Sequence, residues 1–227
     1  MSRPPKVLFG TLRIWLLVLA ASVAAVAMPA ERLSHGQALE ALAEADGSAR
    51  LAGVRRLAEI GTMADVEALL KRLRDADDQV RLHAADAMWR IWGRSGDAEI
   101  DDLYLRGTAE MQGGNFRDAL ATFDRIVLLK PDFAEGWNKR ATIRFLLGDY
   151  ENSLMDCDEV FKRNPYHFGA LAGAGQIHIM LGHLEQALDF FRRALDVNPN
   201  LEGPAQMKEL IERHLRDEEQ ARRRHST

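Results

Sequence analysis

The sequence predicts an all-α protein built of stacked helical hairpins, and three observations support this. Ala and Leu are abundant while aromatic residues make up 7% of the chain, a balance that favours helix over sheet. Proline is scarce inside the long segments of apolar periodicity. Sliding the sequence against itself by 34 positions gives an unbroken match over three units. We therefore expect two N-terminal hairpins in residues 34–93, three hairpin units in 98–201 and one capping helix in 202–224.

The N-terminal segment, residues 1–27, has the three-part layout of a secretory signal peptide. Residues 1–13 are basic, residues 14–27 are uncharged and largely apolar, and Ala25 and Ala27 supply small residues for a cleavage site. We expect cleavage near Ala27 and a periplasmic or secreted mature chain without stable membrane insertion. The alternative is a membrane anchor formed by 14–27, although that stretch makes only about 21 Å of helix against a hydrocarbon core of about 30 Å.

A weaker repeat, with a period of 31 residues, relates 34–62 to 65–93. It aligns Leu42 with Leu73 and Asp46 with Asp77. The stretch 65–85 resembles a HEAT-type helical hairpin, so 34–93 is interpreted as two HEAT-like hairpins. The alternative is four amphipathic helices that only cap the units that follow. In both cases we expect the region to be helical and to pack end-on against those units.

The strong repeat divides into units 100–133, 134–167 and 168–201, and each conserved column has a mechanical reason. A small residue at the eighth position lets the two helices of a unit approach closely, and a glycine at the fifteenth ends the first helix. A large residue at the twenty-fourth position fills the space between the helices, and a proline at the thirty-second stops the second helix. In order, these columns hold Gly107, Ala141 and Gly175; Gly114, Gly148 and Gly182; Phe123, Cys157 and Phe191; and Pro131, Pro165 and Pro199.

These columns resemble the tetratricopeptide repeat (TPR) family, with the second unit the most typical through Trp137, Ala141, Gly148, Tyr150 and Pro165. The resemblance implies a right-handed α-solenoid. The segments 131–142 and 166–171 look like those of small exported TPR proteins of alphaproteobacteria, over roughly residues 89–203.

Composition and spacing argue against catalysis, cofactor binding and general nucleic-acid binding. The net charge is −4 with both signs mixed, which disfavours nucleic acid as a partner. Seven histidines lack metal-ligand spacing, so no metal is expected. No glycine-rich phosphate loop and no nucleophile–base pair is present, so we expect no enzyme and no cofactor. The single cysteine, Cys157, stands in the Phe column and is expected to be buried.

Charged residues occupy columns that TPR units usually keep apolar. Arg106 and Arg140 stand at the seventh position, and Glu110, Arg144 and His178 share the eleventh. One interpretation is a buried ion ladder in which Glu110 lies between arginines on its own and the neighbouring first helix, so that Glu110→Ala costs a few kcal/mol. The other is a site for a partner's carboxylate.

The TPR resemblance implies a concave groove lined by the first helix of each unit. Its candidate partner-binding residues are expected to face inward, at positions that helix packing does not use: Tyr104, Thr108, Met111, Asn138, Thr142, Phe145, Gln176 and Met180. Side-chain amides and adaptable apolar groups suit an extended peptide or a partner helix. Gly169 and Gly173 stand where chaperone-binding relatives carry cations, so recognition of a chaperone tail is not expected.

The sequence thus predicts an exported adaptor that binds a protein or peptide of unknown identity in the TPR groove. The alternative is a non-catalytic accessory subunit that stabilises an envelope assembly or enzyme complex.

Overall fold

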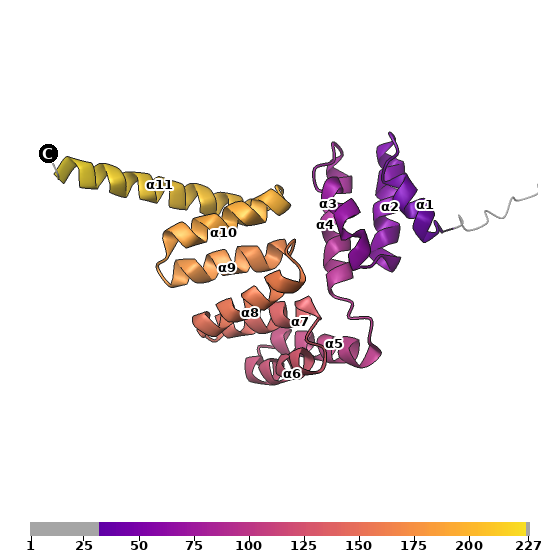
Figure 1. Cartoon of the computed structure of the whole chain (residues 1–227), viewed down its shortest axis with the longest axis horizontal. Helices are drawn as coiled ribbons and strands as arrows, with labels where there is room; N and C mark the ends of the chain where they lie inside the picture. The colour runs from indigo at the N-terminus through magenta and orange to yellow at the C-terminus, as the bar shows by residue number, and fades with distance from the viewer. Residues whose placement is uncertain (1–31, 226–227) are drawn as a thin grey trace, which may run out of the picture. The chain divides into compact units, whose positions relative to one another are not determined.

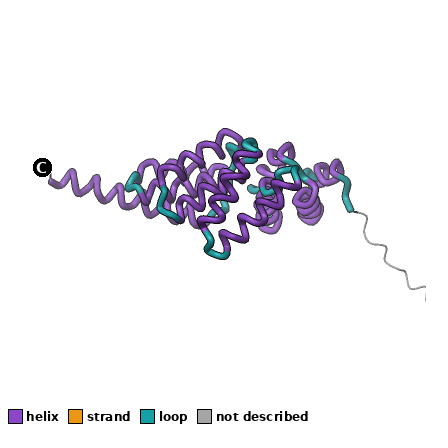
Figure 2. Tube along the Cα trace, turned by 90° about the horizontal axis from the view of Figure 1, so that it is seen from below, coloured by secondary structure: helices purple, strands orange, loops and turns teal. Residues whose placement is uncertain are grey.

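The computed structural model describes residues 32–225, and all regular secondary structure in that range is helical (Figures 1 and 2). The N-terminal region holds α1 (His35–Ala41), α2 (Gly47–Ile60), a short 3-10 helix η1 (Met63–Asp65), α3 (Val66–Arg72) and α4 (Asp78–Trp92). The repeat region holds α5 (Ala98–Gln112), α6 (Phe116–Leu129), α7 (Ala134–Leu146), α8 (Tyr150–Arg163), α9 (Phe168–Met180) and α10 (Leu184–Val197), followed by α11 (Glu202–His225). The all-α prediction of stacked hairpins is confirmed.

The repeat units are antiparallel pairs, α5 with α6, α7 with α8 and α9 with α10. The first helices also contact one another, α5 with α7 and α7 with α9, and form the inner layer of the stack. Gly114, Gly148 and Gly182, which follow those helices, have φ between 76° and 80°, a left-handed conformation that favours glycine. The second helices α6, α8 and α10 each end two residues before a proline. The roles assigned to these columns are therefore confirmed.

Close packing between paired helices explains the small residues of the eighth column. A Cβ atom added at Gly107 would lie 2.7 Å from Cε2 of Phe123, and one added at Gly175 would lie 2.7 Å from Cε1 of Phe191. The middle unit uses Ala141 opposite Cys157 instead. Cys157 is 2% exposed, which confirms its expected burial, and burial raises the pKa of its thiol to about 12.

The N-terminal hairpins have their own apolar core. Asp46 and Asp77 accept hydrogen bonds from the first-turn amides of α2 and α4, so each longer helix begins at a side-chain cap. Buried apolar side chains of all four helices meet in one cluster. Phe168, the first residue of α9, belongs to the same cluster, which joins this region to the third repeat unit.

The expectation that these hairpins pack end-on is wrong. They lie instead against the loops at the ends of the repeat helices, beside which α4 runs in Figure 1. Trp92 stacks on His167 with ring centroids 4.4 Å apart, and Trp89 meets Phe168 edge-on at 5.4 Å. Asn200 donates a hydrogen bond of 2.7 Å to the carbonyl oxygen of Leu73. These contacts bury aromatic area that end-on packing would leave in water.

The last helix, α11, covers the apolar side of α10. Ile211 is buried, and Met207 and Leu215 pack against the same cluster. The arginine run at its end is compensated locally, because Arg222 and Arg223 pair with the glutamates one turn before them. These ion pairs are typical of a solvated cap rather than a free cationic patch.

The signal peptide expected in 1–27, and the alternative anchor in 14–27, lie outside the described residues. Among the helices of residues 32–225, none is long and apolar enough to cross a membrane.

Candidate peptide-binding groove

A cavity of about 80 Å³ opens between α7 and α9 on the inner layer of the stack. It is lined by Asn138, Ala141, Thr142, Phe145, Ser153, Cys157, Gly169, Ala170, Gly173, Gln176 and Ile177. Two features of the sequence create this space. Cys157 replaces the phenylalanine that fills the equivalent position in the other two units, and a Cβ at Gly173 would meet no atom within 4 Å. The cavity therefore lies between the second and third units.

The eight predicted groove residues fall into two groups. Asn138, Thr142, Phe145 and Gln176 line the cavity together. Tyr104, Thr108, Met111 and Met180 do not line it: the first three belong to α5, and Met180 is exposed at the end of α9.

The expectation that helix packing leaves these positions unused is wrong for several of them. Tyr104 packs edge-on against Phe123 and Phe133, with ring centroids 6.1 and 5.8 Å away. Phe145 packs on Tyr150 at 5.7 Å. Asn138 is buried. Replacing Tyr104 or Phe145 with Ala would therefore lower stability as well as alter the groove, so these variants cannot isolate binding.

A buried carboxylate, Glu135, lies in the first turn of α7 and is bonded to the groove residue Asn138. Its side chain is 1% exposed and accepts hydrogen bonds from His167 Nε2 at 2.8 Å, Asn138 Nδ2 at 3.0 Å and Tyr104 Oη at 3.3 Å. Lys139 Nζ lies 3.2 Å away. Burial alone raises the pKa of Glu135, but the hydrogen bond from His167 and the charge and hydrogen bond of Lys139 lower it overall.

The hydrogen bonds of His167 fix its tautomer. The backbone N–H of Ala170 can only donate, and it lies 3.0 Å from Nδ1, so Nδ1 is the acceptor that caps α9. The proton is therefore on Nε2, which donates to Glu135. His167 connects the cap of the third unit with the first turn of the second. No sequence pattern pointed to this pair, because its members are 32 residues apart.

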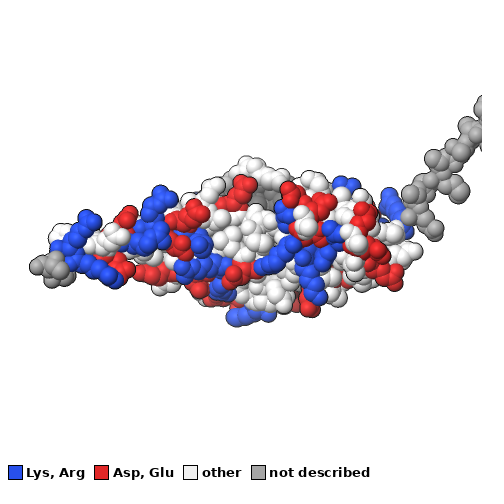
Figure 3. Space-filling model, turned by 90° about the horizontal axis from the view of Figure 1, so that it is seen from above, with Lys and Arg blue, Asp and Glu red and all other residues white. Residues whose placement is uncertain are grey.

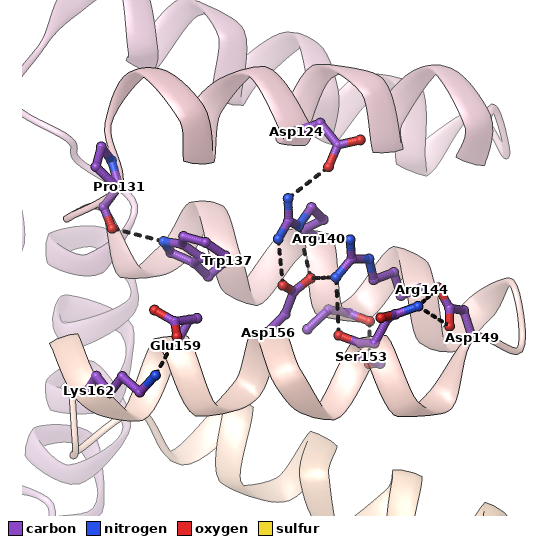
Figure 4. Close-up of polar contacts among 12 residues, drawn as sticks. Asp124, Pro131, Trp137, Arg140, Arg144, Asp149, Ser153, Asp156, Glu159 and Lys162 are labelled. Carbon is purple, nitrogen blue, oxygen red and sulfur yellow. Dashed lines mark hydrogen bonds and ion pairs between the residues drawn. The ribbon is translucent and has the colours of Figure 1, made fainter.

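The predicted ion ladder around Glu110 is not formed; the buried ion network of the repeats is centred on Asp156 instead (Figure 4). Asp156, only 2% exposed in its side chain, accepts from Arg140 Nε at 3.0 Å and Nη2 at 2.7 Å, and from Arg144 Nη1 at 2.9 Å. Arg140 also donates to Asp124 of α6 at 2.8 Å. Burial alone lowers the pKa of Arg140, but Asp156 and Asp124 raise it overall.

Glu110 contacts an arginine on its own helix and none on the neighbouring first helix. It accepts from Arg106 Nε at 2.8 Å and from the Thr122 hydroxyl at 2.7 Å. The Arg106 side chain is 68% exposed. Water screens such a pair, so the expected loss of a few kcal/mol for Glu110→Ala is revised to about 1 kcal/mol, chiefly for the hydrogen bond to Thr122.

The surface charges of the molecule are mixed. Figure 3 shows basic and acidic side chains interspersed over one face, without a continuous field of either sign. Within the part of the chain that the structure describes, no three His, Cys, Asp or Glu side chains are grouped so that they could hold a metal ion.

Stacked hairpins with a cavity on the layer of first helices define a helical repeat protein of the solenoid class. Family models described as tetratricopeptide repeat match residues 104–158 and 168–201. A TPR repeat-containing protein of Rhizobium etli is 36% identical over 130 residues, which are 57% of this chain and 63% of the relative. Tetratricopeptide repeat protein 37 of Xenopus laevis is 26% identical over 197 residues, 70% of this chain and 12% of that protein. The chain thus spans less than two thirds of the length of these relatives.

Solved structures agree in fold. The first TPR of Spaghetti (RPAP3), bound to an HSP90 peptide, has a TM-score of 0.51 at 21% identity and covers 52% of this chain and 95% of its own. The Sgt2 TPR domain from Aspergillus fumigatus has a TM-score of 0.52 at 16% identity, covering 55% and 83%. The chain therefore carries tetratricopeptide repeats in residues 104–158 and 168–201, and it resembles an alphaproteobacterial TPR repeat-containing protein.

Proposed function

We propose that this chain is an exported, non-catalytic adaptor that binds a peptide or helix of another protein in the groove between α7 and α9. The cavity beside Gly173 carries this proposal, because it combines apolar walls with the side-chain amides of Asn138 and Gln176. Amides of this kind can pair with a partner's backbone, while apolar walls take its side chains. The TPR of Spaghetti, which shares this fold, was solved with a peptide bound.

The kind of partner follows from the polarity of the groove. No lysine or arginine lines the cavity between α7 and α9. A ligand bound there would therefore be recognised through hydrogen bonds to amides and through apolar contacts, not through its charge. This disfavours the acidic tail of a chaperone and favours a neutral segment with one or two apolar anchors. Affinity capture from envelope extract, followed by mass spectrometry, would identify the partner protein.

Blocking the groove tests the proposal without weakening the fold. In Gly173→Arg the new side chain would enter open space, and replacing a mid-helix glycine favours the helix. We expect capture of the main partner to fall at least tenfold while the melting temperature stays equal or rises. The matched control is Gly203→Arg on α11, where an added Cβ also meets nothing within 4 Å. Equal capture by both variants would rule out the groove and favour an accessory subunit that binds through other faces.

Export is a separate part of the proposal and rests on the layout of residues 1–27 alone. We expect the mature chain to begin at or near Met28. N-terminal sequencing of the protein recovered from the periplasm measures this directly. An intact Met1 in the membrane fraction would replace secretion with anchoring.

A further inference from the structure

A second cavity, of about 240 Å³, lies where the end of α4 meets the loops after α6 and α8. It shares no lining residue with the groove. Its walls are Met63, Trp92, Arg94, Ser95, Lys130, Asp132, Phe133, Ala134, Arg163 and Asn164. The space is somewhat smaller than the roughly 300–1,000 Å³ typical of drug-sized ligands, so it suits a small molecule or the end of a larger one.

Two buried hydrogen-bond donors on these walls have no partner. They are the indole Nε1 of Trp92 and the amide Nδ2 of Asn164, in side chains of residues 3% and 1% exposed. An unpaired buried donor is costly, and folded proteins contain few. Both groups are also held in place: Trp92 by stacking on His167, and Asn164 by its Oδ1, which accepts from the amide of Tyr166 at 3.2 Å. These two donors are therefore preorganised to bind a hydrogen-bond acceptor of a ligand.

The charge around this cavity is positive. Arg94, Lys130 and Arg163 line it, against one carboxylate, Asp132. Arg94 donates to the carbonyl oxygens of Ala58 and Gly61, contacts that leave its positive charge unmatched. Lys130 has only a loose contact to Asp132, at 3.8 Å. Arg163 is partly neutralised by Glu159.

The N-terminus of α7 also lies at the wall of this second cavity. Ala134, the first residue of α7, lines the cavity, and Phe133 before it offers no side-chain acceptor to the first-turn amides. Such a helix end attracts negative charge. Together with the two unpaired donors and Lys130, it gives the cavity several independent features that favour an anion.

We propose that this cavity binds a ligand that ends in an oxyanion, a carboxylate or a phosphate. Trp92 Nε1 and Asn164 Nδ2 donate hydrogen bonds to it, and Lys130 supplies the opposite charge. The walls come from both the N-terminal hairpins and the repeats, so the ligand also fastens the hairpins to the stack. The site is independent of the groove and of any partner bound there.

The test follows the indole N–H resonance of Trp92 in a ¹⁵N-labelled full-length chain, identified by its loss in Trp92→Phe. Sodium succinate and sodium phosphate are titrated separately, with sodium chloride at matched ionic strength as the blank. We expect a saturable downfield shift of this resonance with at least one probe, and the probe that gives it distinguishes carboxylate from phosphate. The melting temperature should rise with the same probe.

Two variants locate the site. Lys130→Gln should weaken binding of that probe about tenfold, and Asn164→Asp, which keeps the acceptor toward Tyr166 but replaces the donor with negative charge, should abolish it. Lys162→Gln, the same charge change at an exposed lysine outside the cavity, should bind as the native chain does. Absence of a saturable shift with both probes would overturn the proposal. Native affinity in Lys130→Gln would do so too, even if Asn164→Asp did not fold.

Discussion

Asp156→Ala is expected to lower the free energy of unfolding by about 3 kcal/mol, at the low end of the range for breaking a buried ion pair. The substitution leaves the guanidinium groups of Arg140 and Arg144 without the carboxylate that both contact. The loss is not larger because Arg140 keeps its contact with Asp124. For a domain of this size the melting temperature should fall by about 10 °C, measured by circular dichroism or calorimetry.

The matched control is Glu110→Ala, which removes a carboxylate from an exposed arginine in the preceding unit. It should cost about 1 kcal/mol, mainly the hydrogen bond to Thr122. Equal losses in the two variants would mean that burial does not distinguish these ion pairs and that Asp156 is not the centre of the network.

Glu135→Ala is expected to cost about 3–5 kcal/mol near neutral pH, because it strands several buried donors at once. His167 Nε2 and Asn138 Nδ2 would both lose their acceptor, beneath the stacked ring of Trp92. The substitution should also weaken the contact between the N-terminal hairpins and the repeats, because Trp92 stacks on His167. Hydrogen exchange should therefore show faster exchange in α4 as well as in α7 and α9.

The pH dependence of stability gives a second signature of Glu135. Its pKa is lowered on folding despite burial, since the interactions with His167 and Lys139 outweigh desolvation. The carboxylate therefore contributes stability that is fully present above its unfolded pKa of about 4.3, and that contribution is lost as pH falls through the lower folded value. The native chain should accordingly lose stability more steeply below about pH 4.3 than Glu135→Ala does.

Glu99→Ala serves as the control, since Glu99 also stands in the first turn of a first helix but is exposed and pairs with Arg125 on the surface. Its stability curve should run parallel to that of the native chain. If the stability of the native chain fell no more steeply with decreasing pH than that of Glu135→Ala, the pKa of Glu135 would not be lowered in the folded protein.

The repeats were predictable because their information is local. Gly148 and Pro165 dictate where helices end, and the small residue at Gly107 opposite Phe123 dictates how closely they pair. Such constraints recur at a fixed spacing, so one sequence reveals them. Half of the predicted groove residues line the cavity between α7 and α9, and their role in binding stays a prediction. The burial of Asn138 and the packing of Tyr104 could not be predicted from local spacing.

The attachment of the N-terminal hairpins was not predictable, because it depends on contacts between residues far apart in the chain. Trp89 and Trp92, three residues apart on α4, were the available signal, since two large aromatics on one helix face require cover. Gly169 is their complement: a Cβ atom there would lie 2.3 Å from Cη2 of Trp89. The sequence alone does not reveal that Gly169 packs against Trp89. The prediction of the ion network was wrong for a similar reason. The buried partner of Arg140 is Asp156 on α8, which lies outside the seventh and eleventh columns.

The contact between Asn200 and Leu73 joins residues 127 positions apart and has a consequence for how this chain can evolve. Ordinary repeat arrays gain or lose units easily, since each unit touches only its neighbours. Here α3 and α4 span a set length of the stack, from the loop after α6 to the loop after α10. Duplication or deletion of one 34-residue unit would shift the far loop out of reach and separate Phe168 from the tryptophans that cover it. We therefore expect the contacts of the N-terminal hairpins to disfavour a change in the number of units in this stack.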